Sequence, residues 1–129
     1  MMKKKYLIVI ADYYKDISKG LLKSAKDFLP KSSIIKIINV PGVFEIPVTI
    51  SKYIKKYDAF LALGCVIKGQ TPHFDFISQA STDAIMRLSV EHKKPIGNGI
   101  ITCLNRNQAI ARKKKGREAA QAVISVLSQ

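Results

Sequence analysis

Residues 59–76 read AFLALGCVIKGQTPHFDF, and this stretch decides the fold of the chain. Its first nine residues are apolar and become β-branched toward their end, as in a strand buried on both faces of a parallel sheet. A turn at Gly69 follows, and then Thr71 as a capping hydroxyl and Pro72 at the first helical position favour a helix start. His73 falls in the first turn, where N–H groups and the helix dipole attract anions. The stretch therefore predicts a strand, a loop and a helix whose junction suits a phosphate and acid/base site.

The same alternation of strand and helix runs through the rest of the sequence. Continuous apolar runs predict strands, and apolar residues three or four apart predict helices. We expect strands at residues 5–11, 33–40, 59–67 and 96–102, and helices at residues 16–29, 45–57, 72–92 and 108–127. Gly97 and Gly99 are expected to interrupt the last strand, and Val126 is expected to face inward from the last helix. The order predicts one domain over residues 1–129, a three-layer α/β/α fold with a four-stranded parallel sheet covered on both faces.

Length and cysteine usage narrow the class of protein. A chain of 129 residues can bury one core without disulfides or metal ions. Cys65 and Cys103 lack the spacing of metal ligands, and we expect both to be reduced, buried thiols in a cytoplasmic protein. No apolar run approaches the ~20 residues that a membrane-spanning helix needs, and the first residues lack a secretory pattern. We therefore expect no membrane partner and no metal site.

The charge of the chain leaves three interpretations open. Lysine and arginine number 22 against 9 acidic residues, a formal net charge of +13. Nucleic acid, an anionic substrate or a solvated lysine-rich surface would each account for it. Lysines are dispersed over every predicted helix, and no strand interleaves aromatic with basic residues as RNA-binding sheets do. We therefore expect a solvated surface, a few charges serving an anionic small-molecule site, and no nucleic acid.

The predicted topology locates a ligand site. Parallel strands end at the same edge of a sheet, so the loops at residues 12–16, 40–45, 66–73 and 102–107 should converge there. A four-stranded sheet is small, and a pocket at its edge can require a neighbouring chain to close it. We therefore expect small-molecule substrates and a homo-oligomer.

Three of these loops carry motifs that identify a family resemblance. They read PGVFEIP at 41–47, GCVIKGQTPHFD at 64–75, and PIGNGIIT at 95–102 followed by NQAIAR at 107–112. In this order they resemble the lumazine synthase family, from the first strand to the last helix. The resemblance implies a flavodoxin-like subunit that forms pentamers, or decamers and icosahedral capsids built from pentamers, with active sites shared between adjacent subunits.

The resemblance also implies a reaction, the penultimate step of riboflavin synthesis. There 5-amino-6-(D-ribitylamino)uracil condenses with 3,4-dihydroxy-2-butanone 4-phosphate to give 6,7-dimethyl-8-ribityllumazine, with loss of phosphate and water. No metal or organic cofactor is implied. Asn98, which stands where many members carry phenylalanine, also suggests an alternative: a non-catalytic paralogue that only binds flavin or lumazine.

Individual residues acquire expected roles from the same resemblance. His73 would be the catalytic residue, since an imidazole gives and accepts protons near neutral pH, although a histidine at a helix start can simply cap or pack. Gln70, Thr71 and Arg112 would bind the phosphate substrate. Taken alone, Arg112 is equally one charge of a solvated basic run. Asp75 either tunes His73 or interacts with the helix dipole.

On the pyrimidine side, Tyr13 would stack on the heterocycle, although a surface loop tyrosine is the plain alternative. The ribityl chain and pyrimidine pocket would involve Val43, Phe44, Glu45, Cys65, Val66 and Ile67, of which the last three are equally ordinary core residues. Asn98 stands where many members carry phenylalanine, so amide hydrogen bonds would replace stacking on that side. The role of Lys115 and the assembly beyond the pentamer stay open.

Overall fold

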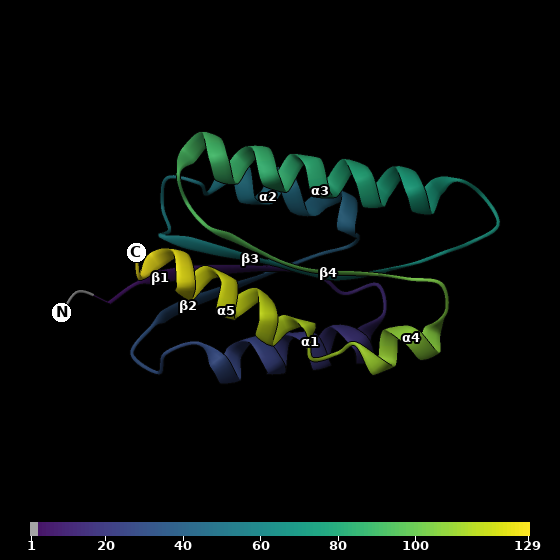
Figure 1. Cartoon of the computed structure of the whole chain (residues 1–129), viewed down its shortest axis with the longest axis horizontal. Helices are drawn as coiled ribbons and strands as arrows, with labels where there is room; N and C mark the ends of the chain where they lie inside the picture. Colours follow the sequence, from purple (N-terminus) through teal and green to yellow (C-terminus); the bar gives the residue numbers. More distant parts are fainter. Residues whose placement is uncertain (1–2) are drawn as a thin grey trace.

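A computed structural model describes residues 3–129. Strands and helices alternate along the chain, and the strands form one parallel sheet (Figure 1). The elements in chain order are β1 (Lys5–Ala11), α1 (Lys15–Phe28), β2 (Ile34–Val40), the 3₁₀-helix η1 (Val43–Glu45), α2 (Ile46–Lys52), β3 (Ala59–Ile67), α3 (His73–His92), β4 (Ile96–Cys103), α4 (Arg106–Ala111) and α5 (Lys115–Leu127). The strand order is β2-β1-β3-β4, and every neighbouring pair is parallel. The predicted α/β class and four-stranded sheet are therefore confirmed.

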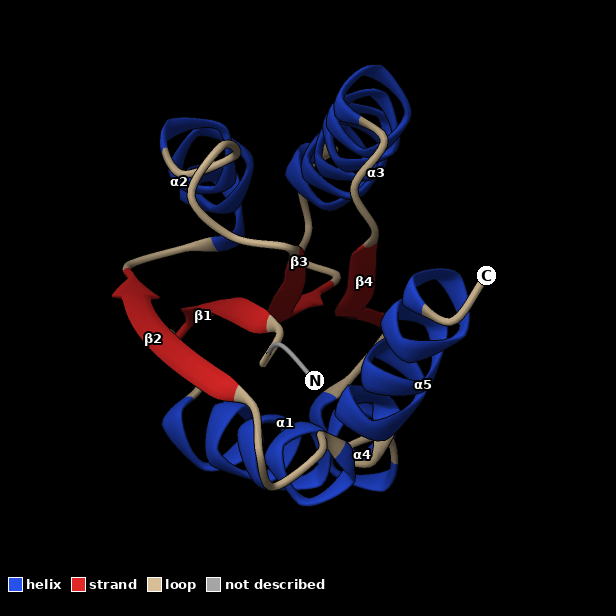
Figure 2. Cartoon of the chain, turned by 90° about the vertical axis from the view of Figure 1, so that its left-hand side faces the viewer, coloured by secondary structure: helices blue, strands red, loops and turns tan. Residues whose placement is uncertain are grey.

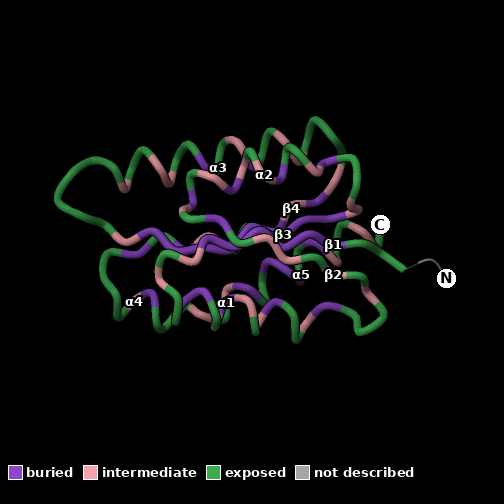
Figure 3. The backbone as a smooth tube through the Cα atoms, turned by 180° about the vertical axis from the view of Figure 1, so that it is seen from behind, coloured by how far each residue is buried: buried purple, intermediate pink, exposed green. Residues whose placement is uncertain are grey.

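Helices cover the sheet on both faces. Figure 2 shows α2 and α3 on one side and α1, α4 and α5 on the other. Successive residues of the inner strands point to opposite faces, so Ile8 joins the core under α1 and α5 while Val9 joins the core under α2. Both residues are fully buried, as are most of their neighbours in β1 and β3 (Figure 3). This double burial explains why these strands read as unbroken apolar runs.

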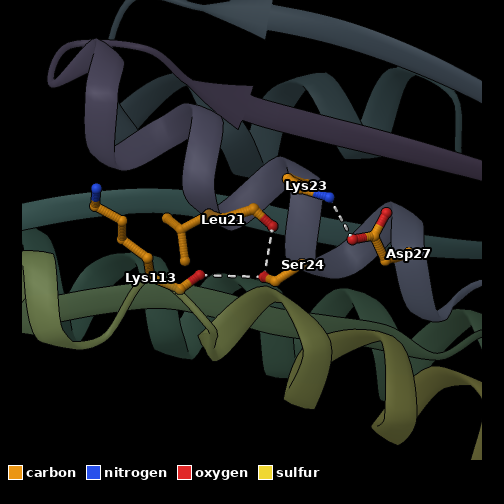
Figure 4. Close-up of polar contacts among 5 residues, drawn as sticks. All are labelled: Leu21, Lys23, Ser24, Asp27 and Lys113. Atoms are coloured by element: carbon orange, nitrogen blue, oxygen red, sulfur yellow. Dashed lines mark hydrogen bonds and ion pairs between the residues drawn. The ribbon is translucent and has the colours of Figure 1, made fainter.

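The last predicted helix, residues 108–127, is wrong as a single element, because the structure has α4 and α5 with a break between them. Ser24 on α1 donates a hydrogen bond from Oγ to the Lys113 carbonyl at 3.1 Å and shares it with the Leu21 carbonyl at 3.0 Å (Figure 4). The carbonyl in the break is thus satisfied by another helix. The predicted inward position of Val126 is also wrong, since that side chain is 46% exposed.

Gly97 and Gly99 do not interrupt β4, which is continuous from Ile96 to Cys103. A Cβ atom on Gly97 would instead collide with the Ala119 carbonyl of α5 and with the Leu61 side chain. The missing side chain therefore lets α5 lie directly on the strand.

Two other helices begin or end differently from the expectation. The second predicted helix, at residues 45–57, starts as a 3₁₀ turn and ends at Lys52. The third begins at His73 with Pro72 as the N-cap, so Pro72 is not its first helical residue. Thr71 Oγ1 accepts only a long 3.4 Å contact from the His73 N–H, which makes it a poor cap. Over residues 3–129, no helix has the length and apolarity to cross a membrane.

Candidate functional site

A cavity of about 670 Å³ lies at the carboxyl edge of the sheet, where three loops meet. Its walls come from the loop after β1, the loop and η1 after β2, and the end of β3 with the start of α3. Eight residues predicted for the site line it: Tyr13, Val43, Phe44, Glu45, Cys65, Val66, Ile67 and His73. We call this space the first cavity.

Aromatic rings surround the mouth of the first cavity. Tyr13, Phe44 and Phe76 are 72%, 68% and 67% exposed. The Tyr13 ring meets the Tyr14 ring edge-on, with centroids 4.9 Å apart and an angle of 83° between the planes. Tyr14 in turn packs against the buried core under α1. The exposed Tyr13 ring therefore offers a face on which a planar heterocycle can stack.

The Cys65 thiol lines the first cavity. Cys65 and Cys103 are free and buried, as expected. Burial raises the pKa of the Cys65 thiol to about 12, and the neighbouring Cys103 adds to the shift. Burial also raises the pKa of the Tyr14 hydroxyl, with Cys65 and Tyr13 contributing further. Both groups are therefore neutral at pH 7, and Cys65 contributes an uncharged thiol to the lining of the first cavity.

The loop between β3 and α3 carries His73 at its end and two predicted phosphate ligands before it. Gln70 and Thr71 are exposed and lie outside the lining of the first cavity, on the segment that leads to His73. The loop is fixed at its start, where the Lys68 N–H donates to the Cys103 carbonyl at 2.8 Å. It runs into the N-terminus of a 20-residue helix, whose dipole favours an anion beside His73.

Asn98 and Arg112 lie elsewhere, in a second cavity of about 670 Å³ on the outer side of β4. The two cavities have no lining residue in common. The Arg112 guanidinium donates from Nη1 to the Thr102 carbonyl at 3.3 Å, and Asn98 Oδ1 accepts from the Ile100 N–H at 3.0 Å. Lys115 also lines this second cavity, where its Nζ lies 3.4 Å from Glu118 Oε1.

The sequence model of the 6,7-dimethyl-8-ribityllumazine synthase family matches residues 3–129. The chain belongs to this family. A 6,7-dimethyl-8-ribityllumazine synthase of Agrobacterium fabrum (strain C58 / ATCC 33970) is 41% identical, over 98% of this chain and 95% of the relative. One from Rhodopseudomonas palustris (strain BisA53) is 42% identical, over 94% of this chain and 82% of the relative. One from Bartonella bacilliformis (strain ATCC 35685 / KC583 / Herrer 020/F12,63) is 42% identical, over 95% of this chain and 87% of the relative.

Four residues that line the first cavity of this lumazine synthase family member were missed by sequence reasoning: Tyr14, Gly42, Phe76 and Ile77. Phe76 lies three positions after His73 on a predicted helix, so the helical spacing could have placed both on one face. Nothing in the sequence distinguishes Tyr14 from Tyr13, whose rings turn to different surroundings only in the folded chain. Among the described residues, no cluster of three or more His, Cys, Asp or Glu side chains could hold a metal ion.

Proposed function

We propose that this chain is a 6,7-dimethyl-8-ribityllumazine synthase, which condenses 5-amino-6-(D-ribitylamino)uracil with 3,4-dihydroxy-2-butanone 4-phosphate in riboflavin biosynthesis. Family membership over residues 3–129 supports the activity. The observation that connects this activity to a site is the first cavity, which Tyr13, Glu45 and His73 line from three separate segments of the chain. In one space, Tyr13 supplies a ring for stacking, Glu45 a carboxylate that accepts hydrogen bonds from hydroxyls, and His73 an imidazole that transfers protons.

The reaction needs little more than positioning and proton transfer. The pyrimidine amine attacks the ketone carbonyl to form an imine, and water leaves; phosphate is then eliminated and a second loss of water closes the ring. The Tyr13 ring stacks on the pyrimidine, and the Glu45 carboxylate with the backbone of Val43 and Phe44 holds the ribityl hydroxyls. Cys65, Val66 and Ile67 form the apolar wall. His73 moves protons to and from the reacting oxygen and nitrogen atoms.

We place the phosphate group at the loop before α3, next to Gln70 and Thr71. Arg112 would complete this cradle with a bidentate contact, but in this chain it lines the second cavity with Asn98. We therefore propose that a neighbouring copy contributes Arg112 and Asn98, in a ring of five subunits. The exposed aromatic rings of Tyr13, Phe44 and Phe76 support this assembly, because a second copy would cover them.

We assign this activity to the cytoplasm. Cys65 and Cys103 are free thiols in the folded chain, which is typical of proteins in a reducing compartment.

A two-substrate assay tests the proposed function. Purified protein, mixed with the pyrimidine and the ketone phosphate, should form lumazine, followed by its absorbance, faster than the same mixture without protein. A rate equal to the spontaneous condensation would refute the activity, and tight lumazine binding without turnover would instead identify a binding protein. Light scattering beside the assay tests the shared site, since a fully active monomer would contradict it.

A further inference from the structure

Arg106 and Asp16 form an ion pair that joins α4 to the first turn of α1. Arg106 Nη2 lies 2.6 Å from Asp16 Oδ2, although the residues are 90 positions apart in the sequence. The other ion pairs of residues 3–129, Lys23–Asp27 and Lys115–Glu118, each connect neighbouring turns of one helix. Arg106–Asp16 is thus the ion pair that connects two separate elements of the described chain.

The α1 end of this pair lies beside the tyrosines of the first cavity. Tyr14 is the N-cap of α1 and its side chain makes no capping hydrogen bond, and the Ser18 hydroxyl in the first turn donates instead to the Ala11 carbonyl of β1 at 2.7 Å. Asp16 is two residues after Tyr14 and provides a second anchor through Arg106. Tyr14 lines the first cavity and meets the Tyr13 ring edge-on at 4.9 Å. Tyr13 is 72% exposed, and its edge-on contact with Tyr14 is the aromatic contact that can orient its ring.

The α4 end of the pair has a fixed base. The Gln108 N–H donates to Asn105 Oδ1 at 2.9 Å, and Gln108 Oε1 accepts from the Leu104 N–H at 2.8 Å. This reciprocal cap, similar to a capping box, holds the helix start from which Arg106 projects. The Arg106 guanidinium therefore reaches Asp16 from a rigid support.

We propose that Arg106 and Asp16 are positioning residues, which hold the Tyr13–Tyr14 pair in the orientation that stacks on the pyrimidine substrate. This inference rests on the proposed function. The Arg106 and Asp16 side chains are 54% and 49% exposed, so the pair is partly screened by solvent. Its loss should weaken pyrimidine binding about two- to fivefold, the range of a surface ion pair.

Arg106→Gln tests the role, because Asp16 also interacts with the α1 dipole and its replacement would mix two effects. We expect the KM for the pyrimidine and the Kd for lumazine, measured by its fluorescence, to rise about two- to fivefold. The KM for the ketone phosphate and the unfolding midpoint should stay unchanged. Arg106→Lys should restore part of the loss, since an ammonium group can also pair with Asp16. Lys23→Gln, which breaks an exposed ion pair further along α1 (Figure 4), is the matched control and should behave as wild type.

Salt provides a second readout. At about 1 M salt the Debye length is about 3 Å, so screening should bring the wild-type KM for the pyrimidine close to that of Arg106→Gln, which should change less. An active wild type with an unchanged pyrimidine KM in Arg106→Gln would overturn this role alone, as would an equal rise in both KM values. A wild type that neither binds lumazine nor forms it would overturn the proposed function as well.

Discussion

Ser24 and Lys113 lie 89 positions apart, yet the Ser24 hydroxyl donates a hydrogen bond to the Lys113 carbonyl at 3.1 Å (Figure 4). This contact connects α1 to the break between α4 and α5, one residue after Arg112. Ser24→Ala would leave the carbonyl without this donor, and we expect the free energy of unfolding to fall by about 1 kcal/mol. Urea unfolding measures the change. Ser128→Ala removes a hydroxyl that bonds only within α5 and should change stability by less. Equal losses in the two variants would argue against a special role for the Ser24 contact.

Gly97 sets the distance between β4 and α5. Gly97→Ala would force the added Cβ against the Ala119 carbonyl, and overpacking of this kind destabilises a protein by about 1–3 kcal/mol. Thermal and urea unfolding should both show the loss. Gly69→Ala is the control, because a Cβ atom there meets nothing within 4 Å, and it should shift stability by less than about 0.5 kcal/mol. A Gly97→Ala protein as stable as wild type would mean that α5 can move away without penalty.

His73 is expected to transfer protons and not to bind substrate tightly. His73→Ala should lower kcat about 100-fold, near the lower end of general acid–base effects, while positioning by the cavity preserves turnover above the spontaneous rate. The KM for the pyrimidine should change little. Varying one substrate at a time gives kcat and KM for wild type, His73→Ala and His92→Ala. The last variant is the control, since His92 lies at the far end of α3. An unchanged kcat in His73→Ala would remove the residue from this role.

Arg112 is expected to act on the phosphate substrate alone. Arg112→Gln should raise the KM for the ketone phosphate by about tenfold or more, because a charge-assisted hydrogen bond contributes about 1.5–3 kcal/mol. The KM for the pyrimidine should stay near the wild-type value. Arg117→Gln, which removes an exposed arginine from α5, is the matched control. If both variants raised the KM equally, only the general positive charge of the surface would matter.

The buried Cys65 thiol makes the free energy of unfolding fall as pH rises in the alkaline range. Its pKa is raised by burial from 9.0 to about 12, so the unfolded chain ionises first. The stabilisation that comes from holding this proton in the folded chain is complete below pH 9 and is lost as pH rises toward 12, because the unfolded chain releases the proton at lower pH. Urea unfolding at about pH 8 and about pH 10.5 should show a shallower decline for Cys65→Ala than for wild type. Parallel declines would contradict the raised pKa.

Local sequence patterns were sufficient to predict the four strands and their alternation with helices along the chain. The run at residues 59–67 matches β3 residue for residue, because burial on both faces leaves a continuous apolar signal. The break between α4 and α5 could not be found this way, because the contacts around it, the Ser24 hydrogen bond to the Lys113 carbonyl and the close approach of α5 to Gly97, join residues that are distant in sequence. Residues 112–114 are one arginine and two lysines, and they include no glycine or proline that would mark the end of a helix.

For the site, the motifs located the loops, and the predicted parallel sheet grouped them at one edge. Tyr13, Glu45 and His73 could be placed together because their loops follow strands of one parallel sheet. Asn98 and Arg112 were expected to reach the site from neighbouring subunits, and in this chain they line the second cavity beside the edge strand β4, away from the first cavity. Which cavity the residues of an edge strand line depends on the tertiary structure, and no local sequence pattern encodes it.

The double burial of β1 and β3 also bears on how the chain moves. Local opening is easiest where few apolar contacts must be broken, and these two inner strands have apolar neighbours on both sides. Their amide hydrogens should be among the slowest in the chain to exchange with solvent, whereas the loops at their carboxyl ends can open without disturbing them. A ligand that enters the first cavity would thus contact loops that open locally, while the strands beneath them keep their structure.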